Sequence, residues 1–319
     1  MIKKRLVATT ILLMTGFVVS GDRLVFIGYD GQIPILKYAI YRNLHGDHQA
    51  DSCIYRFANG KLMNANISIP KGMECLLTKN GVYVFKDTLD RFQIKRNGEN
   101  IIHQFSLKLK WAWDVGAVAM NDKHLFIIAG RNNDSSAIFR VNYRTLDRID
   151  TLWINGICTV LLDATDDYLY YSAESPNAMG PVGNVYQQNI RDGAVKIILK
   201  NVYTLPEAIA IAPQANLIYT SVDAFYGIQA IIANYNYDKS VYTVSQYDKK
   251  HNDAGVFYSY EHSAFISYQY SQDINQWKCL YPNETVEWKP LTNQPLNVMK
   301  EKPTGPNYKK GCITETKRQ

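Results

Sequence analysis

The sequence has few of the residues that build metal centres and nucleophilic active sites. It contains five cysteines and six histidines in 319 residues. No CxxC pair and no Cys/His pair at zinc-binding spacing occurs, so a thiolate zinc site is not expected. The GxSxG, Walker and HExxH motifs are also missing. The sequence therefore carries no sign of the commonest hydrolase or nucleotide-binding centres.

Clustered charge and long apolar runs are missing as well. The 35 Lys and Arg residues exceed the 29 Asp and Glu residues by only six, and they are scattered along the chain. A nucleic-acid partner is not expected, because such a partner requires a basic patch. After residue 20 no segment is apolar enough to span a bilayer, which takes about 20 residues. We therefore expect neither nucleic acid nor membrane as a partner of the mature chain.

Residues 1–20 have the pattern of a secretory signal peptide. A basic stretch, Lys3 to Arg5, precedes an apolar one, Leu6 to Val19, and Ser20 offers a small residue at the cleavage position. A membrane anchor is the alternative, but the apolar run is shorter than the roughly 20 residues that a span needs. The sequence therefore predicts a secreted protein that begins at Gly21.

Secretion permits disulfides and glycosylation. The odd number of cysteines leaves at least one thiol outside an intramolecular disulfide, and their pairing stays open: Cys53, Cys75, Cys158, Cys279 and Cys312. Three sequons permit N-glycosylation, at Asn66, Asn133 and Asn283.

What the sequence does contain is a repeat of strand-like segments. The 23 tyrosines, with many Val and Ile residues, favour β-sheet. The segment DDYLYYSAES, residues 166–175, begins with turn residues, continues through apolar and aromatic residues, and then breaks. Similar segments begin near residues 22, 80, 122, 215 and 262. Counted with 166–175, the six segments align at steps of 58, 43, 44, 49 and 47 residues, at Leu24, Val82, Leu125, Leu169, Ile218 and Phe265. A second family of segments, such as CIYRFANGK and NVYQQNIRDG, follows each copy.

A period near 46 residues with about four strands per copy is typical of propeller blades. Six copies of both families predict an all-β, six-bladed β-propeller; a large sandwich without repeats is the alternative. The innermost strands are expected at five segments: 75–79, 115–120, 158–164, 208–213 and 254–259. Residues 22–30 are expected to be a second strand, paired with an inner strand from the C-terminal side, at 295–300. One blade would then be closed by strands from both chain ends.

These patterns give a domain organisation. The signal peptide covers 1–20, the propeller covers 21–300 with an insertion loop at 31–51, and a C-terminal tail covers 301–319. The insertion contains His45 and His48, a pair that is weak evidence for a metal site. A solvated loop is the alternative there.

Chemistry is expected where the inner strands begin, around the central channel. Acids stand at four of these starts: Glu74, Asp114, Glu207 and Asp253. They would suit a divalent cation or an amine, although turns also favour Asp. Aromatic residues crowd the same connections: Trp111, Trp113 and Tyr203. These rings would suit a planar or cationic ligand, or would pack between blades.

Two groups of known proteins share phrases with this sequence. LPEAIAIAPQANLIYTSVD, residues 205–223, resembles the blade phrase of propellers of the gluconolactonase and senescence-marker group. That resemblance implies a divalent metal held by a Glu, an Asn and an Asp, for which Glu207 or Glu74, Asn155 and Asp253 are the nearest matches. NGVYVFKDTLDRF and WAWDVGAVAMNDKHLFI resemble insect ommochrome-binding proteins and, less closely, the yellow and royal-jelly family. This second resemblance implies a non-catalytic carrier of small aromatic molecules.

Three functions stay open. The first is a secreted, monomeric binding protein that takes a small aromatic pigment or an amine, with no cofactor. The second is a metal-dependent lactonase or esterase with Ca²⁺ as its ion. The third is a protein-interaction scaffold that uses the loop at 31–51. Because no complete metal-ligand set is recognisable, we favour the first, with Trp111 and Trp113 as stacking faces and Asp114, Glu207 and Asp253 as counter-charges.

Overall fold

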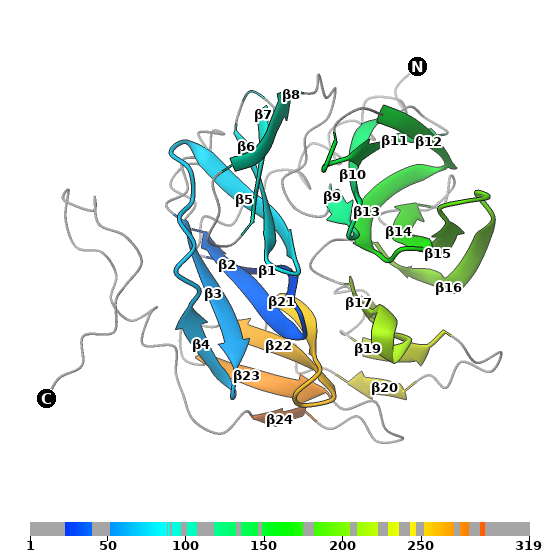
Figure 1. Cartoon of the computed structure of the whole chain (residues 1–319). Coiled ribbons are helices and arrows are strands. Elements are labelled where there is room, and N and C mark those ends of the chain that lie inside the picture. The colour runs from blue at the N-terminus through cyan, green and yellow to red at the C-terminus, as the bar shows by residue number, and fades with distance from the viewer. Residues whose placement is uncertain are drawn as a thin grey trace, which may run out of the picture.

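The protein is an assembly of antiparallel β-sheets in the computed structural model (Figure 1). The residues that the structure describes are 23–39, 52–87, 89, 91–96, 101–106, 118–131, 135–145, 149–174, 182–204, 209–222, 229–235, 243–246, 252–270, 275–280 and 288–290. Within these ranges the chain forms strands and one turn of 3-10 helix, η2 (Pro213–Ala215).

The N-terminal third forms an eight-stranded sheet in the order β4-β3-β2-β1-β5-β6-β7-β8. Its first meander comprises β1 (Arg23–Asp30), β2 (Ile33–Ala39), β3 (Ser52–Ala58) and β4 (Lys61–Asn64). Its second comprises β5 (Met73–Lys79), β6 (Val82–Asp87), β7 (Arg91–Arg96) and β8 (Ile101–Ser106). The two meanders join where β1 pairs with β5 in parallel, over two residues of each strand.

Four four-stranded sheets follow, each a meander in chain order. The next contains β9 (Val118–Met120), β10 (His124–Arg131), β11 (Ser135–Asn142) and β12 (Ile149–Asn155). Then come β13 (Ile157–Ala164), β14 (Tyr168–Glu174), β15 (Val182–Asn189) and β16 (Val195–Tyr203). After these lie β17 (Ile209–Ala212), β18 (Leu217–Val222), β19 (Gln229–Asn234) and β20 (Thr243–Gln246). The last sheet contains β21 (Asn252–Ser259), β22 (Ala264–Tyr270), β23 (Asn275–Leu280) and β24 (Trp288–Pro290).

The first strands of the meanders surround a common centre (Figure 1). Each contacts the first strand of the meander before and after it, in the order β1, β5, β9, β13, β17, β21, and β21 contacts β1 in turn. The sheets therefore form a closed ring, which is a β-propeller. The five inner strands expected from the sequence are confirmed as β5, β9, β13, β17 and β21. The count of six blades requires the eight-stranded sheet to be two blades, and it stays a prediction.

Local sequence explains why the strands turn where they do. Asn59-Gly60 and Asn80-Gly81 both have positive φ at both residues, the conformation of a two-residue type I′ hairpin. Asn and Gly reach that region at little cost, so these dipeptides end one strand and start the next. Between the turns the strands carry the apolar residues that fill the core.

The hydrophobic core lies between adjacent sheets. Tyr170 and Tyr171 of β14 show the arrangement, because successive side chains on a strand point to opposite faces. Tyr171 packs in a cluster with Phe126 and Ile138 of the preceding sheet, whereas Tyr170 packs with Ile218 of the following one. Most of the segment 166–175 is thus a second strand, β14, whose tyrosines pack between adjacent sheets.

The N-terminal strands correct one expectation. Residues 22–30 were expected to be a second strand, but β1 is the first strand of its meander, and residues 33–39 of the expected insertion loop form the second strand, β2. Among the described residues, no strand from the C-terminal side joins β1 to β4. Residues 295–300 and the tail at 301–319 lie outside the described ranges. The irregular first step of 58 residues arose because β1 resembles a second strand in composition.

Among the described residues, the first and last sheets meet through side-chain packing and not through a shared strand. Phe257 of β21 stacks on Phe26 of β1, with ring centroids 5.7 Å apart, and contacts Phe57 of β3 edge-on at 5.2 Å. The Tyr29 hydroxyl donates to the Tyr258 carbonyl oxygen at 2.8 Å and accepts from the Tyr258 amide at 3.2 Å. The first and last sheets therefore meet through aromatic rings and one phenol.

Candidate functional site

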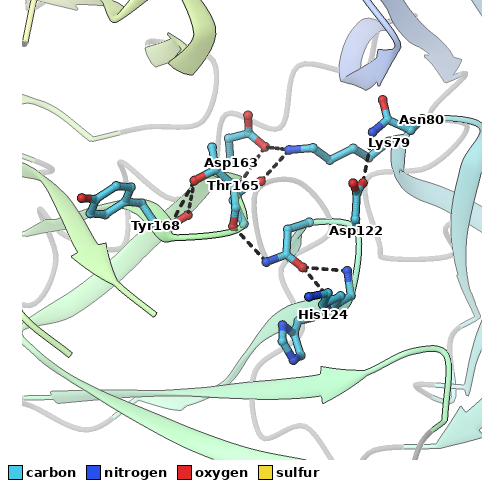
Figure 2. A network of polar contacts seen from close by, with 10 residues as sticks. Lys79, Asn80, Asp122, His124, Asp163, Thr165 and Tyr168 are labelled. Atoms are coloured by element: carbon cyan, nitrogen blue, oxygen red, sulfur yellow. Dashed lines mark hydrogen bonds and ion pairs between the residues drawn. The ribbon is translucent and has the colours of Figure 1, made fainter. Parts of the chain in front are cut away.

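The ring of inner strands has two ends with different chemistry. At one, which we call the starting end, the inner strands begin; at the other, the turn end, they run into hairpins to their second strands. A set of polar contacts at the turn end joins three consecutive hairpins, those after β5, β9 and β13 (Figure 2). The turn end is therefore the best-defined polar site among the described residues.

Two side-chain amides make the first two links of this network. Asn80 Nδ2, after β5, donates to Asp122 Oδ1, after β9, at 3.1 Å. Asn121 Nδ2 donates to the Thr165 carbonyl oxygen, after β13, at 2.9 Å. The Asn121 side-chain oxygen also accepts from the Lys123 and His124 amides at 2.9 and 2.7 Å, which fixes the turn before β10.

Lys79 makes the third link and crosses from β5 to β13 past the sheet between them. Its Nζ donates to Asp163 Oδ1 at 2.8 Å and to the Ala164 carbonyl oxygen at 2.5 Å (Figure 2). The side chains of Lys79 and Asp163 are each 22% exposed. The pair is thus partly desolvated, and charge-assisted hydrogen bonds of this kind are stronger than neutral ones.

Asp163 lies among tyrosines that come from several sheets. Its negative charge helps to raise the pKa of four phenols, although burial is the larger cause in each case. They are Tyr29 of β1, Tyr170 of β14, Tyr235 after β19 and Tyr260 after β21. Since these residues belong to four different meanders, we infer that Asp163 lies near the centre of the ring. The raised pKa values keep the phenols neutral.

The tyrosines also contact one another. The rings of Tyr29 and Tyr260 meet edge-on with centroids 5.5 Å apart, and those of Tyr170 and Tyr235 lie 6.0 Å apart. Gln187 Nε2 donates to the Tyr170 hydroxyl at 3.1 Å. A carboxylate among aromatic rings is an arrangement that suits a cation, because ring faces and the carboxylate both attract positive charge.

The sequence placed the site at the other end of the inner strands. Of the seven residues named there, Glu74 alone has a described side chain. Its carboxylate pairs with the Lys37 ammonium of β2, and the Lys37 side chain is only 1% exposed. A buried charge needs such a partner. Glu74 therefore neutralises a buried lysine at the junction of two meanders.

The other six predicted residues are less fully described. Asp253 belongs to β21, where it pairs with Gln269, and Tyr203 belongs to β16, where it pairs with Val182. Trp111, Trp113, Asp114 and Glu207 lie outside the described residues, as do His45 and His48. Their predicted roles stay predictions.

The sequence analysis missed Lys79, Asp163 and the tyrosines. Both charged residues stand at the far ends of segments already recognised as inner strands, in CLLTK and CTVLLDA. A charged residue that ends a buried strand was the available signal. The contact between Lys79 and Asp163 past β9 could not be predicted, because no local sequence pattern indicates the distance between two strands of a ring.

Two further residue types have plain structural roles. Cys158 is fully buried on β13, and its amide donates to Ser136 Oγ at 2.8 Å. Trp153 is 68% exposed on the outer strand β12.

A search of the described residues for three or more His, Cys, Asp or Glu side chains able to share a metal ion finds no such group. The acids at 114 and 207 fall outside that search. The Ca²⁺ prediction therefore stays untested.

In the same part of the chain, no helix has the length and apolar character that crossing a bilayer requires.

Comparison with known proteins supports the fold. No family model and no curated protein matches this chain. Among solved structures, TolB from Acinetobacter baumannii is similar with a TM-score of 0.53 and 12% identity, over 81% of this chain and 67% of that one. At this identity the likeness concerns the fold alone.

Two further structures resemble the chain more weakly. A protein from Bacteroides fragilis assigned as a 6-phosphogluconolactonase has a TM-score of 0.49 and 14% identity, over 84% of this chain and 82% of that one. A puromycin-hydrolyzing peptidase from Mycobacterium tuberculosis has a TM-score of 0.45 and 10% identity, over 89% of this chain and 56% of that one. The propeller-type fold is supported by the likeness to TolB, whereas none of these comparisons supports the resemblance to ommochrome-binding proteins.

Proposed function

We propose that this chain is a secreted, non-catalytic binding protein that holds a small ligand with a cationic amine and an aromatic ring in its central channel. The observation that carries the proposal is the Asp163 carboxylate, which is partly exposed, pairs in register with Tyr170 and interacts electrostatically with Tyr29, Tyr235 and Tyr260. The carboxylate would bind the amine, and the ring faces would contact the aromatic part.

The proposed function is the one expected from the sequence, but the proposed ligand site lies at the other end of the inner strands. The expectation put the ligand at the starting end, on Trp111, Trp113 and Asp114. The described side chains favour the turn end, because the lysine that pairs with Asp163 there, Lys79, is 22% exposed, whereas Lys37, which pairs with Glu74 at the starting end, is 1% exposed. The metal-dependent hydrolase would use the starting end, and no described side chain favours it.

Tyramine is a suitable probe, since it joins a primary amine to a phenol. We expect the mature protein to bind tyramine and to bind 4-ethylphenol, which lacks the amine, at least tenfold more weakly in isothermal titration calorimetry. Asp163→Asn should weaken tyramine binding by about tenfold to a hundredfold, the loss typical of a charge-assisted hydrogen bond of about 1.5–3 kcal/mol.

A matched control separates this loss from a change in net charge. Asp192→Asn removes the same charge from an exposed hairpin between β15 and β16, where the carboxylate accepts from the Ala194 amide. It should leave tyramine binding unchanged. Equal affinities of wild type and Asp163→Asn, with both folded by circular dichroism, would remove the proposed site.

Secretion has an independent test. Expressed as the full chain in a secreting cell, the protein should reach the medium with Gly21 as its first residue, as read by N-terminal sequencing. Retention in the cell with residue 1 intact would contradict this part of the proposal.

A further inference from the structure

The position that a ligand amine would take at Asp163 is already filled by an amine of the protein. Lys79 Nζ lies 2.8 Å from Asp163 Oδ1 and 2.5 Å from the Ala164 carbonyl oxygen. These are two acceptors for one ammonium, which has three donors. A protonated primary amine presents the same donors, so the two acceptors define an ammonium site.

The competing interpretation is that the Lys79 side chain has a purely structural role. Its side chain links the hairpins after β5 and β13, but those hairpins are also linked through the one after β9, by Asn80 to Asp122 and by Asn121 to Thr165. The backbone next to Lys79 is held independently, since the Asn80 amide donates to the Tyr29 carbonyl oxygen at 2.9 Å. The connection of the three hairpins therefore does not depend on the Lys79 side chain.

The Lys79 side chain is also only partly buried. Lys79 and Asp163 both retain 22% exposure, in contrast to Lys37, whose side chain is 1% exposed beside Glu74. A lysine side chain regains rotamer entropy when it is released into water. Exchanging one ammonium for another keeps the carboxylate neutralised throughout, so the site never passes through a buried unpaired charge.

Resting on the proposed function, we propose that the Lys79 ammonium is an internal occupant of the amine site, which a ligand's primary amine displaces from Asp163. The competition lowers the apparent affinity by the fraction of molecules in which Lys79 has left. It also sets specificity: primary amines supply N–H donors to both Asp163 and Ala164, whereas a trimethylammonium group supplies none. The preferred ligand class is therefore aromatic primary amines.

Removing the occupant should tighten binding. Lys79→Met keeps a long side chain without the charge, and we expect it to bind tyramine at least tenfold more tightly than wild type. The same charge removed at Lys196→Met, on the exposed outer strand β16, should change the affinity less than twofold. Tyramine with a trimethylated nitrogen should bind the wild type at least tenfold more weakly than tyramine itself.

Displacement is measured directly on the wild-type protein, which also covers a Lys79 variant that fails to fold. Brief treatment with limiting acetic anhydride, followed by peptide mass spectrometry, reports the accessibility of each lysine. Because tyramine also consumes the reagent, acetylation of Lys79 is expressed relative to that of the exposed Lys196 on β16. Saturating tyramine should raise this ratio several-fold. Unchanged or reduced acetylation of Lys79 would overturn the displacement.

The two proposals fail in different ways. If Asp163→Asn loses tyramine binding but Lys79→Met gains none and acetylation does not rise, the binding function stands and the internal occupant is wrong. If Asp163→Asn binds as well as wild type, the proposed site is wrong and the inference falls with it.

Discussion

Cys75 of β5 shows how burial sets the chemistry of a single side chain. Its residue is fully buried, and its thiol donates to the Leu77 carbonyl oxygen at 3.8 Å. Burial raises the pKa of the thiol to about 12, and the nearby Lys37 ammonium opposes that shift without cancelling it. Cys75 is therefore a neutral core residue at any physiological pH, and not a nucleophile.

This pKa predicts a pH dependence of stability. The raised pKa means that the folded state holds the thiol proton more tightly than the unfolded state, whose pKa is near 9. The contribution is complete below pH 9 and is lost as pH rises toward about 12, by up to about 1.4 kcal/mol per pH unit. Urea unfolding between pH 8 and 11 should show a steeper fall for wild type than for Cys75→Ala. Parallel curves would contradict the prediction.

Gly28 allows β1 to approach β5 closely. It lies at a bulge in β1 with φ +129°, and it is one of two β1 residues that pair with β5. A Cβ at this position would lie 2.0 Å from the Thr78 carbonyl oxygen, which is backbone and cannot move aside. The close approach of the two inner strands therefore requires glycine here.

Gly28→Ala should destabilise the fold severely, by more than about 3 kcal/mol, because it combines positive-φ strain with a backbone clash. Gly31→Ala is the matched control: its φ is +61°, but nothing lies within 4 Å of the new Cβ. Gly31→Ala should lower the free energy of unfolding only by the backbone strain, about 1 kcal/mol. Chemical unfolding of both variants tests this, and equal losses would show that the clash is relieved elsewhere.

The strand patterns were sufficient to predict the architecture but not every strand's place. The segments of the inner strands ending at Lys79 and Asp163 were recognised, since a buried strand leaves a continuous apolar signature. The role of residues 22–30 was misjudged because RLVFIGYD has the apolar pattern of a second strand, and its partner choice depends on the bulge at Gly28. The Lys79–Asp163 contact depends on ring geometry, which no single strand encodes.

At the scale of the whole molecule, the ring needs its first and last sheets to stay together. Propellers commonly face this problem because each blade contacts only its neighbours. Here Phe257, which is 1% exposed, stacks on Phe26 and meets Phe57, and Tyr29 bonds Tyr258. Since no strand is shared between these sheets in the described part of the chain, the closure depends on this packing.

Phe257→Ala should therefore open the ring locally as well as destabilise it. Truncating a buried Phe costs about 3–5 kcal/mol, and we expect hydrogen exchange to accelerate most in β1–β4 and β21–β24. Phe126→Ala removes an equally buried ring from the cluster between the β9–β12 and β13–β16 sheets, and it should accelerate exchange there instead. Matching exchange patterns for the two variants would mean that the ring unfolds as one unit, with no weaker junction. A junction-specific pattern would establish that the ring is closed by side chains, and that opening begins where the chain's first and last sheets meet.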